Sequence, residues 1–338
     1  MLRRWSKNAI ALLPLLLNAQ SWDLQQSGTT ASLRGIHAVS EKVVWGSGTG
    51  GTYLRTTDGG LRWLAAVVPG AEALDFRDVH AVDDRTTYLL SIGSGDNSRI
   101  YKTSDAGAHW KLQLTNPDAT GFFDEMAFWN ATHGILVGDP VGGQLVVMTT
   151  ADGGVTWQRQ HLPRAREGES AFAASGTGIT VSGNSEVWVG TGGTGGSRVF
   201  HSIDAGVTWS VADTPIRHDS QSAGIFSLAF SDPLHGVAVG GDYKKIDEAA
   251  NAVALTSDGG RTWIAPAKSL PAGFRSAVAF VRDRNIWIAT GTAGSDISHD
   301  GGQSWTSFDK GNYNAITFIG ASGWAVGPQG RIARFQSK

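Results

Sequence analysis

Short apolar runs, separated by turns rich in glycine, follow one another along almost the whole chain. Examples are residues 36–39 (IHAV), 43–46 (VVWG) and 53–55 (YLR). Runs of this length between turn residues predict β-strands, and runs that are apolar at successive positions predict strands covered on both faces. The pattern therefore predicts an all-β protein in which each unit contributes four short strands.

One eight-residue pattern, Ser/Thr-x-Asp-x-Gly-x-x-Trp, occurs six times. Its aspartates, spaced 42 to 54 residues apart, are Asp58, Asp105, Asp152, Asp204, Asp258 and Asp300. An Asp carboxylate can accept hydrogen bonds from nearby backbone N–H groups, and glycine supplies the positive φ that tight hairpin turns require. We interpret each copy, an Asp box, as a structural turn and not as a catalytic carboxylate.

The units number seven, one more than the Asp boxes. Three further apolar runs follow the sixth box without a box of their own: residues 315–318, 324–327 and 331–335. Residues 22–26 supply the missing fourth strand from the other end of the chain, and Trp22 takes the place of the Trp that follows a box. We predict a single seven-bladed β-propeller over residues 20–338, closed by this N-terminal strand, because closure removes exposed sheet edges.

The amino-acid composition excludes several kinds of binding site and catalytic group. The chain has 28 Lys+Arg against 30 Asp+Glu, 45 Gly and no Cys. This charge balance lacks the basic surface that non-specific nucleic-acid binding needs. The absence of Cys excludes disulfides, Cys-type zinc sites and thiol nucleophiles.

Residues 1–19 predict a signal peptide, because the basic residues Arg3, Arg4 and Lys7 precede the apolar run 9–17. That run is too short to span a bilayer. We therefore expect an exported protein, periplasmic or secreted, without a membrane span once the signal is removed. An uncleaved anchor is the alternative, and the Sec and twin-arginine export routes both stay open.

The repeats resemble a known group of propellers. With phrases such as residues 76–82 (FRDVHAV), they are similar to photosystem II assembly/stability-factor-like proteins. They also resemble the wider Asp-box (BNR) group, which includes sialidases and xyloglucanases. The assembly-factor resemblance implies a non-enzymatic, protein-binding role with arginines on one face. Sialidases carry a Phe/Tyr-Arg-x-Pro motif that this sequence lacks, and Asp-box xyloglucanases use two such propellers facing a cleft.

A narrower resemblance links residues 121–124, 168–176 and 223–227 to exported bacterial propellers labelled "oxidoreductase". The sequence gives that label no support, since it has no nucleotide-binding fingerprint on a strand–helix unit, no Cys, and no haem or metal motif. We expect neither a cofactor nor a metal site.

A binding site is expected at the mouth of the central channel, where the innermost strand of each blade begins. Aligning the repeats places seven residues at this position, within one or two residues: Arg34, Arg77, Phe123, Ser170, Ile225, Arg275 and Tyr313. Guanidinium groups suit carboxylate or phosphate recognition, so the three arginines predict a basic rim, with Tyr313 beside it. Packing of the arginines within the fold is the alternative interpretation.

The longest spacings between Asp boxes fall on the fourth and fifth blades, and long loops in a compact repeat are often functional. With the third blade, these loops predict a cleft that faces the arginines. Its residues are Asp124, Asp139, Glu169, Asp242 and Tyr243. For each of them, a solvated loop position is the alternative.

Two functions follow from this picture. The first is an exported, monomeric, non-enzymatic propeller that grips a protein or peptide on its loop-rich face. The second is a glycan-active hydrolase of the sialidase-like, Asp-box type, with Asp124, Asp139, Glu169 and Asp242 as the candidate catalytic carboxylates. Two carboxyl groups about 5–9 Å apart across a sugar-sized groove would favour the hydrolase.

Overall fold

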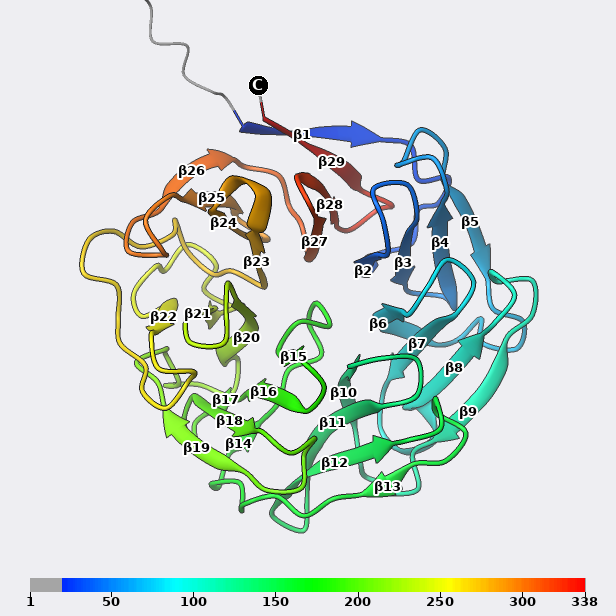
Figure 1. The fold of residues 1–338 in the computed structure, drawn as a ribbon, viewed down its shortest axis with the longest axis horizontal. Helices are drawn as coiled ribbons and strands as arrows, with labels where there is room; N and C mark the ends of the chain where they lie inside the picture. Colours follow the sequence, from blue (N-terminus) through cyan, green and yellow to red (C-terminus); the bar gives the residue numbers. More distant parts are fainter. Residues whose placement is uncertain (1–19, 338) are drawn as a thin grey trace, which may run out of the picture.

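The computed structural model describes residues 20–337, so the predicted signal peptide at 1–19 lies outside the described residues. Seven antiparallel sheets surround a central channel, as Figure 1 shows. The innermost strands of neighbouring blades contact one another all the way round the ring. The predicted seven-bladed β-propeller is confirmed. Within residues 20–337, no helix is long and apolar enough to cross a membrane.

The strands run outward from the channel in chain order. Blades one to three consist of β2 (Leu33–Ala38), β3 (Val44–Gly48), β4 (Thr52–Thr56) and β5 (Leu64–Val67); β6 (Asp75–Ala81), β7 (Thr87–Ile92), β8 (Arg99–Thr103) and β9 (Lys111–Thr115); and β10 (Phe123–Phe128), β11 (Gly134–Val141), β12 (Gln144–Thr150) and β13 (Gln158–Arg159). A 3₁₀ turn, η1 (Gly95–Asn97), joins β7 to β8.

The second half of the ring follows the same plan, with two additions. Blades four to seven consist of β15 (Ile179–Ser182), β16 (Glu186–Gly190), β18 (Arg198–Ser202) and β19 (Ser210–Asp213); β20 (Ala223–Phe230), β21 (Gly236–Asp242) and β22 (Val253–Thr256); β23 (Ala277–Val281), β24 (Ile286–Gly291), β25 (Gly294–Ser298) and β26 (Thr306–Asp309); and β27 (Ala315–Ile319), β28 (Ser322–Val326) and β29 (Ile332–Ser337). The two-residue strands β14 (Glu169–Ser170) and β17 (Gly192–Gly193) extend the sheet of blade five, and η2 (Arg282–Arg284) follows β23.

The ring closes as the sequence predicts. The first described strand, β1 (Gln20–Gln25), pairs antiparallel with β29, from Gln20 opposite Ser337 to Gln25 opposite Ile332. It starts two residues before the predicted position. Trp22 packs edge-on against Phe335 at 5.3 Å, and its indole N–H donates to Ser295 Oγ in blade six (3.0 Å).

Blade five lacks a regular fourth strand. The chain after its Asp box makes a single bridge, from Leu255 to Ile264, and then leaves the blade. Pro266 follows two residues later and has no N–H to donate, so it cannot continue the ladder. Beyond it, Ser269 N donates to the Gln303 carbonyl (3.3 Å), which fastens this segment to blade six.

The core lies between the blades. Trp188 of β16 is fully buried and stacks on His201 at 4.6 Å and on Phe230 of the next blade at 4.0 Å. An aromatic ring buries more apolar area than most other side chains. A repeat rich in Trp can therefore fill the space between neighbouring blades.

Each Asp box pins the turn between the third and fourth strands of its blade. In the first box, Thr56 Oγ1 donates to Asp58 (2.8 Å) and accepts from Gly60 N (3.0 Å), and Asp58 accepts from Arg62 N (3.0 Å). Gly59 N also reaches the carbonyl of Lys42 in the turn between strands one and two (2.9 Å). The Asp boxes therefore fasten the end of the propeller opposite the expected site.

Candidate functional site at the channel mouth

The innermost strands of four blades begin with a β-bulge at the same position. In β2, β6, β10 and β20 the register to the next strand skips one residue, and the skipped residues are Arg34, Arg77, Asp124 and Phe226. A bulge leaves its extra residue out of the pairing and redirects its side chain. All four residues line one cavity of about 600 Å³ at the channel mouth.

Blades six and seven contribute Ser276 and Asn314 at the corresponding position. The corresponding position can be found from a glycine near the end of the second strand, which lies close to the first strand of the same blade. A Cβ on Gly138, Gly291 or Gly327 would lie 2.2, 2.4 or 2.3 Å from the carbonyl oxygen two residues before the cavity residue of its blade. Only glycine allows this close backbone approach. Six of the seven blades thus present one equivalent residue to the cavity.

The fourth blade instead sends a loop, residues 170–178, toward the centre of the channel, just before β15 in Figure 1. Arg77 Nη1 donates to the Ala173 carbonyl (3.0 Å), and Ser175 Oγ donates to the Ser276 carbonyl (2.8 Å). These bonds tie the loop to blades two and six. Its first half lines the cavity and forms its floor.

One wall of the cavity is basic. Arg34 and Arg77 lie side by side there, and Arg77 Nε donates to Asp75 (2.9 Å). Burial, and then the charge of Arg77, lower the pKa of Arg34 to about 10, and Asp75 offsets this only in part. The Nε of Arg34 is buried without a hydrogen-bond partner among the described residues. Arg77 thus pairs with Asp75, whereas Asp75 Oδ1 is buried without a partner among the described residues.

The neighbouring wall is acidic. Asp124 is 2% exposed, and its Oδ2 has no partner in the described part of the chain. Asp139, at the end of β11, accepts from Ala171 N of the floor loop (3.2 Å). Burial raises the pKa of Asp139 to about 6, and burial with the charges of Asp139 and Glu125 raises that of Asp124 further. Residues 20–337 hold no group of three or more His, Cys, Asp or Glu side chains placed to bind a metal ion.

The remaining wall is aromatic. Phe172 of the floor loop stacks on Phe226 at 4.2 Å, and Phe274 meets Phe226 edge-on at 4.8 Å. Tyr243 completes the group at 6.1 Å from Phe226 and is 47% exposed, at the entrance. The cavity therefore combines a positive wall, a negative wall and a flat apolar wall.

The structure brings together five of the residues that the sequence singles out. The cavity is lined by Arg34, Arg77, Asp124, Asp139 and Tyr243. Their role in binding stays a prediction, because geometry alone does not test it.

The other four predicted residues do not line the cavity. Glu169 is buried in an ion pair with Arg198 (Nε at 2.9 Å) and holds the base of the floor loop. Asp242 accepts from Ser220 Oγ (2.9 Å) and from the backbone of its own loop. Burial opposes ionisation of Asp242, yet these hydrogen bonds and that from Ser222 lower its pKa.

Arg275 and Tyr313 lie one residue before the cavity position of their blades. Arg275 is fully buried and pairs with Asp296 (Nε at 2.6 Å). Tyr313 is 1% exposed, with the Arg331 guanidinium over its ring at 5.7 Å. The pairing of β23 with β24 and of β27 with β28 is continuous, and these strands begin directly after Ser276 and Asn314. The repeat alignment thus falls one residue short of the cavity position in these two blades.

Of the aromatic wall, sequence analysis predicted Tyr243 but missed Phe172, Phe226 and Phe274, and it also missed Ser276 and Asn314. One signal could have located the position. A glycine recurs in the second strand of six blades, at Gly48, Gly138, Gly190, Gly240, Gly291 and Gly327. In five of these blades its close contact is with the carbonyl oxygen two residues before the cavity residue, whereas Gly190 contacts Ile225 of the next blade.

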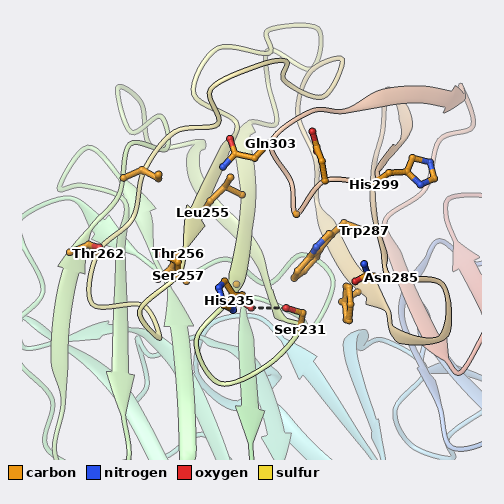
Figure 2. Close-up of a pocket in the computed structure, with 15 residues that line it drawn as sticks. Ser231, His235, Leu255, Thr256, Ser257, Thr262, Asn285, Trp287, His299 and Gln303 are labelled. Carbon is orange, nitrogen blue, oxygen red and sulfur yellow. Dashed lines mark hydrogen bonds between the residues drawn. The ribbon is translucent and has the colours of Figure 1, made fainter.

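A second depression lies at the opposite end, between blades five and six, where blade five lacks its fourth strand. Figure 2 shows this groove of about 480 Å³, with His235, Trp287 and His299 on its sides. Its polar groups are used within the fold: His235 Nδ1 contacts Asp232 (2.9 Å), and Asp300 is bound within its own box. None of the described buried side-chain atoms without a partner belongs to a residue of this groove.

The sequence matches the family model of the photosynthesis system II assembly factor YCF48 over residues 118–270. It is 26% identical to the photosystem II assembly protein Ycf48 of Synechococcus sp. (strain JA-2-3B'a(2-13)), over 87% of this chain and 81% of that protein. This chain is an Asp-box propeller similar to the photosystem II assembly factors. A photosystem II assembly lipoprotein Ycf48 of Synechococcus sp. (strain CC9902) is 24% identical over 76% of this chain and 84% of its own length.

Solved structures show the same fold at lower identity. A structure described as YCF48 bound to D1 peptide superposes with a TM-score of 0.66 at 17% identity, over 98% of this chain and all of that chain. YCF48 from Cyanidioschyzon merolae gives 0.62 at 19% identity, over 93% and 98% of the two chains. Virginiamycin B lyase from Staphylococcus aureus gives 0.65 at 11% identity, over 94% and 99%. One fold thus occurs in assembly factors and in a lyase, so the site must decide the function.

Proposed function

We propose that this chain is an exported, non-enzymatic propeller that binds a peptide segment of a partner protein at the channel-mouth cavity. The convergence of one equivalent residue from each of six blades on a single cavity carries the proposal. That cavity holds unpartnered polar atoms on Arg34 and Asp124 beside an aromatic wall. Pockets with a few convergent polar groups on apolar surface are typical ligand sites.

The relatives support the same role. One solved relative is described as bound to a D1 peptide, and two sequence relatives are described as assembly proteins. Export rests on the predicted signal peptide and on the description of one relative as a lipoprotein. Fractionation of cells that produce the full chain, with antibody detection of the processed protein, tests export separately from binding.

The glycan hydrolase is the weaker candidate. Glycosidases place two carboxyl groups on either side of the scissile bond. Asp124 and Asp139 come from neighbouring strands of one blade, and the neighbouring wall holds Arg34 and Arg77. Release of sugar from a polysaccharide panel, abolished by Asp124→Asn, would establish the hydrolase instead.

Selection from a displayed random-peptide library tests the proposed function. We expect the native protein to enrich peptides that the Arg34→Gln/Arg77→Gln variant binds at least about tenfold more weakly, a loss of about 1.4 kcal/mol. The matched control is Arg85→Gln, an exposed arginine at the Asp-box end, which should bind as the native protein does. Equal binding by the double variant, or a library that yields no binder, would contradict the proposal.

A further inference from the structure

We infer that the acidic wall of the cavity is an ammonium subsite: Asp124 and Asp139 receive the free amino terminus of the partner's peptide segment, and a carboxylate of the same segment contacts Arg34 and Arg77. This rests on the proposed function, because it takes the ligand to be a peptide. It adds which peptides fit: those that present a positive and a negative group within one cavity, together with an aromatic or apolar side chain.

A buried carboxylate oxygen without a hydrogen-bond donor is the first observation behind this inference. Asp124 is almost completely buried, yet its Oδ2 has no hydrogen-bond donor among the described residues, and Asp124 lines the cavity. A buried acceptor left unpaired is costly, which points to a donor brought by a ligand. An ammonium group has three N–H donors and can serve both carboxyl groups at once.

The neighbouring basic wall has unpaired polar atoms of its own. Arg34 Nε is a buried donor without an acceptor in the described part of the chain; Arg77 Nε donates to Asp75 Oδ2, and Asp75 Oδ1 has no donor there. A ligand with only a negative group would leave Asp124 unpaired, and one with only a positive group would leave Arg34 unpaired. A dipolar ligand satisfies both walls.

The charges around the acids fit a cation better than a neutral donor. Asp124 faces Asp139 and, along its own strand, Glu125, which in turn faces Asp78. Arg34 and Arg77 stand on the other wall, beside Asp75. Burial raises the pKa of both Asp124 and Asp139, the charge of Asp139 raises that of Asp124 further, and a bound cation would lower both. Binding should therefore release protons at a pH where the pair is partly protonated.

The aromatic wall comes from the floor loop and from blades five and six, on the far side of the acidic wall from the arginines. Phe172 and Phe226 present a stacked pair, and Tyr243 stands at the entrance. Ring faces attract cations and accept flat side chains. The floor loop fixes this wall relative to the acids, because Ala171, beside Phe172, donates its N–H to Asp139.

Calorimetric titration with a panel of free dipeptides, each with one aromatic residue, tests the inference. Each peptide is compared with its N-acetylated form and its C-terminal amide. We expect at least one free dipeptide to bind, acetylation to weaken it at least about tenfold, and Asp124→Asn/Asp139→Asn to do the same. Asp219→Asn removes a charge from an exposed side chain that pairs with Arg217 and does not line the cavity, and should change nothing.

Proton release gives an independent readout. Titration in two buffers of different ionisation enthalpy should show release with the native protein and none with the double Asn variant. The inference is overturned if the acetylated peptides bind as tightly as the free ones, or if the double variant keeps native affinity. If the library peptides bind and these changes leave their binding intact, the proposed function stands without the ammonium subsite; if no peptide binds at all, both fail.

Discussion

At one end of the propeller six Asp boxes repeat the same contacts, and at the other the equivalent position of six blades carries five residue types. In every box the Ser/Thr hydroxyl donates to its Asp at a distance between 2.8 and 3.1 Å. At the mouth the residues are Arg34, Arg77, Asp124, Phe226, Ser276 and Asn314. Repetition accompanies the contacts that hold the fold, and variation accompanies the surface that can distinguish ligands.

The two ends also treat the same side chain in opposite ways. Asp152 of the third box accepts hydrogen bonds from the Thr156 side chain and backbone, which lower its pKa to about 2. Asp139 of the same blade has its pKa raised by burial to about 6. The hydrogen bonds to the carboxylate of a box stabilise its charged form. The carboxylate at the mouth is buried with fewer hydrogen bonds, so its charged form is less stable, as is common at functional sites.

The largest effect should come from the glycine that creates the bulge. In Gly138→Ala the new Cβ would lie 2.2 Å from a backbone carbonyl, so the third blade must shift. We expect a loss of about 2–3 kcal/mol in unfolding free energy, typical of overpacking, together with loss of peptide binding. Denaturant unfolding and calorimetry measure the two effects.

Gly46→Ala is the matched control, since its Cβ would meet its nearest atoms at 3.5 and 3.6 Å, which is ordinary contact. It should keep stability and binding. If both variants behave alike, the close approach at the mouth is not what positions Asp124.

Next in size is the pH dependence of the channel wall beside the cavity. Burial raises the pKa of Asp78 to about 7, although its Oδ2 accepts from Met126 N (2.7 Å). The folded state therefore keeps a proton that the unfolded chain has lost, and this contribution to stability disappears as pH rises from about 4 through about 7. Asp78→Asn keeps the acceptor without the charge.

The unfolding free energy of Asp78→Asn relative to the native protein should thus increase steadily between about pH 4 and about pH 7, and then level off. Urea unfolding at a series of pH values measures it. The lowered pKa of buried His37, which acts in the opposite direction, is common to both proteins and cancels in the difference. A constant difference across this range would show that Asp78 is ionised throughout.

A single box should matter less. Thr150→Val keeps the side-chain shape but removes the hydroxyl that donates to Asp152 (2.8 Å) and accepts from Gly154 N (2.9 Å). We expect a loss of about 1 kcal/mol, the usual value for a hydrogen-bonded group, and unchanged peptide affinity. Weakened binding would mean that the two ends are coupled through the blade.

The sequence predicts the Asp-box end of the propeller better than the channel mouth. The Asp boxes, the seven blades and the closing strand are predictable because each relies on local turn chemistry repeated along the chain. At the mouth, the lining residue of blades three, five, six and seven comes one place after the aligned one, so Arg275 is buried and Ser276 reaches the cavity. The contact of Phe172 with Phe226 depends on how far one loop crosses the channel, which no local pattern specifies.

The smallest effects separate the mouth from the groove between blades five and six. His299 is exposed on the groove in Figure 2, and its replacement by Ala should leave peptide affinity unchanged and stability within about 0.5 kcal/mol. Tyr243→Ala removes a half-exposed ring from the mouth, and should weaken the same peptide a few-fold without affecting folding, since an exposed aromatic contact is worth about 1 kcal/mol or less. Both substitutions remove a ring from an exposed position, so titration of the two variants compares location alone. If the loss followed His299 instead, the peptide would bind the groove, and the unpartnered atoms at the mouth would need another explanation.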